Sequence, residues 1–305
     1  MNKKWLAGSV VIILLLTICA VYIFIPRTLT VSVYTKVNCT SDGALRMING
    51  SHFWEGLPRA VHSNDQYRLT GNYFQRVTMI RQRNDGKDIE GSIKVVPLTW
   101  DDTIVMQWSG VIPTSLNPLK RFLQYQEAKN TKVEMTGFLD TLASFLGRKE
   151  HIYGMDVNAG VIKDTEMVTT RWARTAYPGT ADVYEKIGLL RSYIKSQGAK
   201  ETGYPMLNAT RDKNDSFEIM VAIPVNRRLA GNAVITSKRF ISWKAFEGEV
   251  KGGPAVVEEA MVQLRNYVTD YRHTFMSIPF QSLVTERSQE PDTLKWVTRV
   301  VQLVN

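Results

Sequence analysis

The sequence predicts an α+β protein with an N-terminal transmembrane helix followed by two domains. Three observations predict it: an uncharged apolar run at the N-terminus, a series of strand-like segments that ends in a helical stretch, and a helix-bearing segment that occurs twice. The chain has 305 residues, enough for about two ordinary domains. We expect a cytoplasmic tip and transmembrane helix over residues 1–27, a first domain over 28–160 and a second over 161–305.

The apolar run Trp5–Ile25 contains 21 residues without a charge. At 1.5 Å per residue, a helix of this length spans the ~30 Å hydrocarbon core of a bilayer. Lys3 and Lys4 place the N-terminus in the cytoplasm. We therefore expect a single-pass protein of the cell membrane, with both domains outside the cytoplasm.

Two alternatives to an uncleaved anchor are a cleaved secretory signal and a lipoprotein signal. The run is longer than an ordinary signal-peptide core and lacks a small-residue cleavage site. Cys19 follows Ile18, whereas lipoprotein processing resembles a pattern with a small residue just before the cysteine. An anchor is therefore the preferred interpretation.

The first domain begins with an alternating apolar and polar segment, Thr28–Val37, which is typical of a half-buried strand. A short helix is expected next, with Ser41 or Asp42 as its N-cap. Leu139, Leu142 and neighbouring apolar residues at spacings of 3 and 4 predict a helix near the end of the domain. Between these helices, strands are expected at Tyr67–Phe74, Arg76–Gln82, Gly91–Pro97, Thr103–Trp108 and Arg121–Glu127.

This order of elements resembles the START-like helix-grip fold of the polyketide cyclases and lipid-transfer proteins. In that fold a bent sheet wraps a long C-terminal helix around an elongated apolar cavity. Trp54 stands near the position where the family often has a tryptophan. The resemblance implies a cavity that Trp54, Trp100 and Trp108 line, and an ordinary α+β domain with a filled core is the alternative.

The second domain contains a duplication. Residues 179–205 align without a gap onto residues 253–279, an offset of 74 (253 − 179 = 74). Eight of the 27 aligned positions are identical, against about two expected from average residue usage. Each copy repeats the same apolar helix face, with Leu190 of the first copy matching Leu264 of the second. Strand-like segments flank both helices, so the sequence predicts a duplicated β-α-β-β unit.

A duplicated unit of this kind resembles the GyrI-like effector-binding domain of AraC-type and MerR-type regulators. The segment 283–304 also resembles the last hairpin of that family, with the acid Glu286, a Glu290-Pro291 turn and a closing strand that begins at Trp296. Arg299 stands where the family's closing strand usually has an acid, which puts affinity for cationic ligands in doubt.

Charge and motif patterns narrow the functional classes. The net charge of +9 is spread along the chain without a basic block, so no nucleic-acid partner is expected. The four histidines are scattered, so neither a metal site nor a cofactor is expected. The expected partners are a small-molecule ligand and the membrane, and the sequence identifies no protein partner.

The candidate ligand-binding residues are an acid and four aromatic residues of the second domain. A carboxylate on a pocket-lining sheet face can pair with a ligand cation or transfer a proton. Aromatic faces can stack on a ligand, although aromatic residues on strands more often fill a core. The five candidates are Glu286, Trp172, Phe246, Trp243 and Trp296.

The predicted function is non-catalytic binding of an amphipathic or lipid-like small molecule, as a sensor or carrier. No catalytic residue is assigned, because Glu286 has no identifiable acid or base partner in the sequence. The alternative is a hydrolase or cyclase that uses a pocket acid with aromatic neighbours. Because Arg299 replaces an acid, we expect a neutral or anionic ligand rather than a cationic one.

Overall fold

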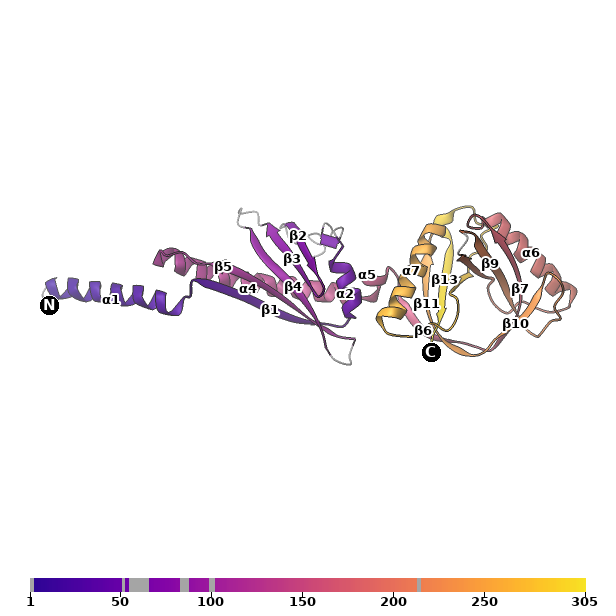
Figure 1. The fold of residues 1–305 in the computed structure, drawn as a ribbon, viewed down its shortest axis with the longest axis horizontal. Coiled ribbons are helices and arrows are strands. Elements are labelled where there is room, and N and C mark those ends of the chain that lie inside the picture. Colours follow the sequence, from indigo (N-terminus) through magenta and orange to yellow (C-terminus); the bar gives the residue numbers. More distant parts are fainter. Residues whose placement is uncertain (1–2, 51–52, 55–65, 83–87, 99–101, 213–214) are drawn as a thin grey trace. The chain divides into compact units, whose positions relative to one another are not determined.

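A computed structural model describes residues 3–305, except 51–52, 55–65, 83–87, 99–101 and 213–214, and only the backbone of residues 3–7. The chain forms two compact units, Met1–Arg148 and Lys149–Asn305 (Figure 1). Both units contain helices and an antiparallel sheet, so the α+β class is confirmed.

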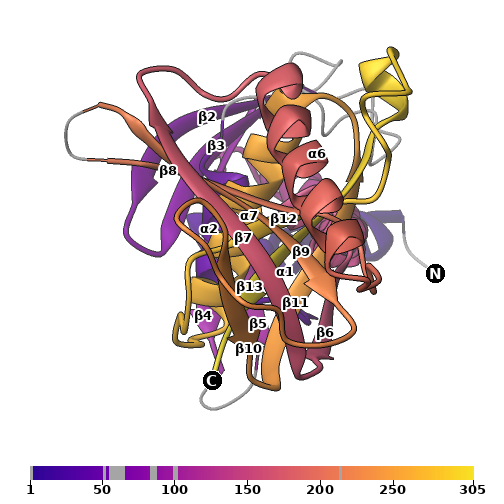
Figure 2. The ribbon, with the colours of Figure 1, turned by 90° about the vertical axis from the view of Figure 1, so that its right-hand side faces the viewer.

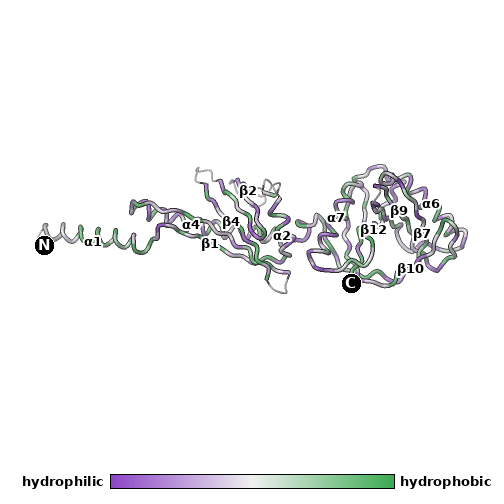
Figure 3. Tube along the Cα trace, in the orientation of Figure 1, coloured by the Kyte–Doolittle hydropathy of each residue, from purple (hydrophilic) through white to green (hydrophobic). Residues whose placement is uncertain are grey.

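The prediction of a transmembrane helix is wrong. Within the part of the chain that the structure describes, no helix combines the length and the apolar character that a membrane crossing requires. The run of apolar residues lies in α1 (Lys3–Phe24), where green marks hydrophobic residues in Figure 3. A span needs about 20 apolar residues, and side chains of α1 are described only from Gly8 onward. The predicted cell-membrane localisation and membrane partner depended on this span and are withdrawn with it.

In the first unit, five antiparallel strands form a sheet in the order β1-β5-β4-β3-β2. The predicted strands between residues 28 and 108 lie in this sheet, and the short helix α2 begins after an N-cap at Thr40, one residue earlier than expected. The bounds are β1 Thr28–Val37, α2 Ser41–Ile48, β2 Gln66–Tyr73, β3 Arg76–Gln82, β4 Ile89–Pro97, β5 Ile104–Pro113 and α4 Pro118–Leu146.

The segment Arg121–Glu127 is helical, which corrects the prediction of a strand there. Asn117 caps α4, because its Oδ1 accepts hydrogen bonds from the backbone N–H groups of Leu119 and Lys120. Pro118 at the first helical position favours the same start. The helix that starts at this cap therefore runs through the segment that was predicted to be a strand.

Trp54 and Trp108 of the first unit are core residues, and Trp100 lies outside the described residues. Trp108 is 1% exposed and lies against Gly91 and Gly110, where an added Cβ would approach the indole to 2.6 Å. The indole N–H of Trp54 donates to the carbonyl oxygen of Ile48 at 2.6 Å, and Trp54 is 2% exposed. These contacts are those of a filled core at both positions.

The second unit is an eight-stranded antiparallel sheet with two long helices. The strand order is β10-β7-β9-β8-β12-β13-β11-β6. The bounds are α5 Lys149–Tyr153, β6 Val157–Ile162, β7 Thr165–Arg174, α6 Thr180–Ser196, β8 Met206–Arg211, β9 Phe217–Val225, β10 Thr236–Phe240, β11 Trp243–Lys251, α7 Pro254–Asp270, β12 Phe280–Leu283, η1 Thr293–Lys295 and β13 Val297–Leu303. The predicted boundary at residues 160 and 161 falls within β6, which pairs with β11.

Each copy of the duplication has one strand more than the predicted β-α-β-β unit. The additional strands, β6 and β10, pair with the other copy: β6 lies beside β11, and β10 lies beside β7. The two exchanges have the same register. Thr236 of β10 pairs with Thr169 of β7. Their counterparts in the repeat, Ile162 of β6 and Trp243 of β11, also pair with each other. The copies are thus related by a pseudo-twofold rotation and hold each other through their edge strands.

The pseudo-twofold axis passes between β8 and β12. There Leu207 pairs with Gln281, its own counterpart in the repeat (207 + 74 = 281). Both helices lie on the outer face of the sheet, with α6 beside β7 and β9 and α7 beside β11 and β13 (Figure 1). Figure 2 shows α6 along the same sheet after a rotation of 90°.

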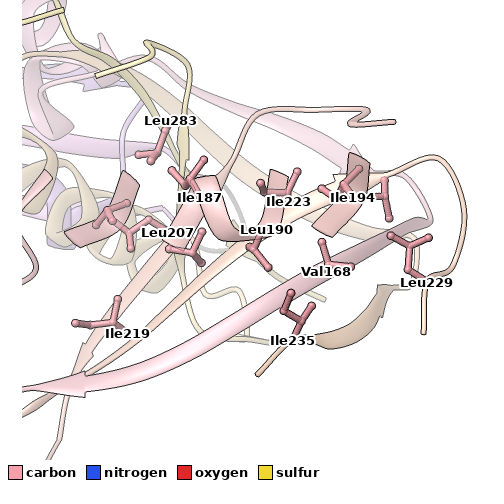
Figure 4. Packing of buried hydrophobic residues seen from close by; sticks show 13 residues of the cluster. Val168, Ile187, Leu190, Ile194, Leu207, Ile219, Ile223, Leu229, Ile235 and Leu283 are labelled. Carbon is pink, nitrogen blue, oxygen red and sulfur yellow. The ribbon is translucent and has the colours of Figure 1, made fainter. Parts of the chain in front are cut away.

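The repeated apolar stripe forms the core under each helix. Leu190 and Leu264 are 0% and 1% exposed. Figure 4 shows Leu190 and Ile194 of α6 packed with strand residues such as Val168 and Ile223. The helix face predicted from spacings of 3 and 4 is therefore the buried one.

The sheet curls strongly around its inner face. Phe240 of edge strand β10 stacks on Phe280 of β12, with ring centroids 5.7 Å apart, although β7, β9 and β8 separate these two strands in the sheet. The inner face therefore closes on itself as a half-barrel, and a small core that includes Ala245 and Val301 fills part of it.

Candidate functional site

A small cleft lies on the pseudo-twofold axis, on the helix-bearing face of the second unit. Its volume is about 170 Å³. Two pairs of repeat counterparts line it: Thr180 with Pro254, and Leu207 with Gln281. Thr180 and Pro254 are the first residues of α6 and α7, so both helices begin at this cleft.

The helix N-termini give the cleft a positive electrostatic character. The first N–H groups of a helix carry a partial positive charge that favours anions. In α6 the side chain of Asp182 accepts from the backbone N–H of Gly179 at 3.1 Å and satisfies one of these donors. In α7 the first helical residue is Pro254, which has no N–H.

Arg287 is the charged residue among the described lining residues of the cleft. Its Nη2 donates to Thr298 Oγ1 at 2.6 Å, and its guanidinium lies over the ring of Trp296, with Cζ 4.9 Å from the centroid. Burial lowers the pKa of the Arg287 guanidinium, although the nearby Tyr184 and Tyr177 act to raise it. Among the residues that the structure describes, Arg287 has no carboxylate partner and its buried Nε has no hydrogen-bond partner.

The loop that carries Arg287, residues 284–296, is fixed to α6 of the other copy. The hydroxyl of Tyr184 donates to the carbonyl oxygen of Thr285 at 3.2 Å and accepts from the backbone N–H of Arg287 at 2.7 Å. Burial raises the pKa of Tyr184, and the bond from the Arg287 N–H opposes this effect. The phenol therefore remains a neutral donor and acceptor at neutral pH and holds Arg287 at the cleft.

Glu286 was predicted to lie on a strand, but it belongs to this loop, which it anchors, and it is not among the residues that line the cleft. Its Oε2 forms an ion pair with Arg191 Nη1 at 2.9 Å, and its Oε1 accepts from Ser288 Oγ at 2.7 Å. Burial acts to lower the pKa of Arg191, but its contacts with Glu286 and Glu201 outweigh burial and raise it. The predicted acid is thus already paired with a cation of α6, and its neighbour Arg287 lines the cleft.

The aromatic candidates lie at different places in the second unit. Trp172 is half-buried and packs against the core under α6. Phe246, its repeat counterpart, is 8% exposed and makes an edge contact with Tyr267 at 5.0 Å. None of the five candidates is among the residues that line the cleft.

Trp243 and Trp296 differ in how far they are exposed to solvent. Trp243 is 37% exposed at the start of β11. Trp296 is 6% exposed, and its indole N–H donates to the carbonyl oxygen of Glu290 at 2.8 Å. Through its ring, Trp296 supports the guanidinium of Arg287, which gives it an indirect place at the cleft.

Sequence analysis missed Arg287, Gln281 and Tyr184. A signal for Gln281 was present, because extending the repeat alignment past Pro205 would have paired it with Leu207. Arg287 comes from the longer loop of the second copy, which has no counterpart in the first and left no repeat signal. Over the described residues, no group of three or more histidine, cysteine or acidic side chains could hold a metal ion.

Comparisons with known proteins give only distant similarities. No protein-family model matches the chain, and no curated protein matches it. Among solved structures, it is similar to the EcmrR C-terminal domain, at 15% identity and a TM-score of 0.43, covering 50% of this chain and 98% of that one.

Two further solved structures are similar to this chain. SAV2435 bound to tetraphenylphosphonium is 15% identical with a TM-score of 0.32, covering 50% of this chain and 94% of that one. A hydrolase from Listeria innocua is 7% identical with a TM-score of 0.39, covering 49% and 92%. Each of these similarities covers about half of this chain.

Proposed function

We propose that the second unit is a non-catalytic effector-binding domain of the GyrI-like type, which holds a small acidic molecule in the cleft between the starts of α6 and α7. The observation that carries the proposal is the half-buried guanidinium of Arg287, whose Nε is buried without a hydrogen-bond partner and which has no carboxylate partner among the described residues. Removing a charge from water without pairing it is costly, so a ligand carboxylate or phosphate would complete the site.

The surroundings of Arg287 favour the same ligand charge. Two helix N-termini meet at the cleft, and both favour negative charge over positive charge. The amide of Gln281 is held in place, because its Nε2 donates to Tyr177 Oη at 3.0 Å. The cleft of about 170 Å³ is smaller than drug-sized pockets of about 300–1,000 Å³. It suits a compact acid.

Glu286 has a supporting role in this proposal. Its ion pair with Arg191 and the bonds of Tyr184 hold the loop against α6 and thereby keep Arg287 in position. The sequence-based hypothesis that Trp172 stacks on the ligand stays a prediction, because Trp172 packs with the core beside the cleft.

The geometry does not favour the hydrolase or cyclase alternative. General acid–base catalysis needs titratable groups within hydrogen-bond reach of the reacting atoms. The lining residues of the cleft include neither a carboxylate nor a histidine, as far as the described residues show. We therefore propose binding without a chemical step.

The test is a comparison of Arg287→Met with the native chain. A panel of small carboxylates, phosphates and their neutral amide or alcohol analogues is first screened by thermal shift, with tetraphenylphosphonium as the cationic probe. Isothermal titration then gives the affinity of each acid that binds. We expect Arg287→Met to weaken acid binding about tenfold to a hundredfold, the worth of one charge-assisted contact. The variant should fold, because replacing a buried charge by an apolar side chain of similar volume is often tolerated.

Arg299→Met is the matched control. Arg299 lies on β13 of the same unit, is 38% exposed and contacts Glu249 at 3.5 Å, away from the cleft. The Arg299→Met variant should bind the acids with the same affinity as the native chain. Equal affinities in native and Arg287→Met protein would contradict the proposal, as would a preference of the native chain for tetraphenylphosphonium over every acid in the panel.

A further inference from the structure

A second cavity lies on the inner, concave face of the curled sheet, which is the face opposite the helices. On β7, Val168 packs under α6, and its neighbour Met167 points to the other side and lines this cavity. The volume of the cavity is about 180 Å³. Because a sheet separates the two faces, this cavity is distinct from the cleft that contains Arg287.

The walls of the concave cavity are apolar and adaptable. Three methionines from three neighbouring strands, Met167, Met206 and Met220, line it together with the stacked rings of Phe240 and Phe280. Methionine side chains are flexible and polarizable, and they fit irregular apolar groups. These walls suit a short hydrocarbon chain.

The cavity also has basic walls, with Arg171, Lys238 and Arg239 among the lining residues. Arg239 is already paired with Asp164, and Arg171 lies 3.6 Å from Glu218. Lys238 has no carboxylate within ion-pair distance among the described residues. Its Nζ lies 3.6 Å from the sulfur of Met220, directly at the apolar wall. Burial and the neighbouring Arg171 lower the pKa of Lys238, and the more weakly acting Glu218 opposes them.

We propose that the concave cavity is a second binding site, which takes a small amphipathic anion such as a medium-chain carboxylate. The hydrocarbon tail lies among the methionines and Phe280, and the anionic head contacts Lys238 and Arg171. The same arrangement disfavours an amphipathic cation, because its head would face two positive side chains.

The experiment uses the full chain and three probes of equal chain length: octanoate, 1-octanol and octylamine. Isothermal titration measures the affinity of the protein for each probe, at probe concentrations below those at which the probe aggregates. We expect octanoate to bind most tightly. Lys238→Met should weaken octanoate about tenfold to a hundredfold, because it removes a charge-assisted contact, and should leave 1-octanol unchanged. Lys244→Met, at an exposed lysine of β11 outside the cavity, is the matched control.

A second variant, Ala222→Phe, fills the cavity from β9, and circular dichroism checks its fold. It should abolish binding of both octanoate and 1-octanol, whereas Arg287→Met in the other cleft should change neither. The proposal fails if Lys238→Met and Lys244→Met bind octanoate equally, or if octylamine binds as tightly as octanoate. If only Arg287→Met loses octanoate binding, octanoate binds in the cleft that contains Arg287, and the proposal also fails.

Discussion

The first copy of the repeat connects its last two strands between Arg211 and Phe217, whereas the second copy connects them through the longer loop between Leu283 and Val297. Elsewhere the copies match closely, in the buried helix stripe, the glycine N-caps and the exchanged edge strands. The single long loop places one guanidinium at a cleft that is otherwise symmetric. A duplicated core thus supplies the scaffold, and a local insertion in one copy supplies the charge.

The largest expected difference between the copies is at the paired aromatic positions. Phe246→Ala should lower the free energy of unfolding by about 3–5 kcal/mol, because Phe246 is buried against Tyr267 and His273. Trp172→Ala should cost less, because Trp172 is half-buried. Urea denaturation of both variants measures the free energy of unfolding. Equal losses of free energy would show that the two positions are packed alike.

The matched leucines should show the symmetry of the copies. Leu190→Ala and Leu264→Ala each remove a fully buried side chain from the same helix stripe, so each should cost about 2–5 kcal/mol. Chemical unfolding gives both values. A near-neutral result at either leucine would mean that the corresponding helix is not packed on the sheet as the repeat requires.

The smallest effect is expected where the long loop meets α6. Glu286→Gln removes the charge that pairs with Arg191, and both side chains are partly exposed. An ion pair of this kind contributes about 0–1 kcal/mol, so the free energy of unfolding should change little. Glu201→Gln is the control, because Glu201 pairs with the same arginine at 3.1 Å. A loss above about 2 kcal/mol for Glu286→Gln alone would show that the loop is part of the core and not an addition to it.

The candidate site was only partly predictable. The repeat placed α6 and α7 on equivalent positions, and the segment around Glu286 was singled out from its resemblance to a family hairpin. The residue that lines the cleft is the next one, Arg287. Glu286 instead pairs with Arg191, nearly a hundred residues earlier in the chain. Which of two adjacent loop residues enters a cleft depends on such distant partners, and no local pattern encodes it.

The sequence by itself determined the two duplicated helices, their buried faces, the strands of the first sheet and the strand-like segments that flank the two helices. These features follow from spacings of two, three and four residues, which depend on backbone geometry that each segment carries locally. Arg121–Glu127 was wrongly predicted to be a strand, because the helix start at Asn117 and Pro118 was not considered.

Only the tertiary structure decided the exchange of β6 and β10, the curl that brings Phe240 onto Phe280, and the position of Arg287 at the cleft. Each of these joins residues far apart in the chain. Their free energies arise from non-local pairing and packing, so the same local patterns are compatible with several arrangements until the whole unit folds.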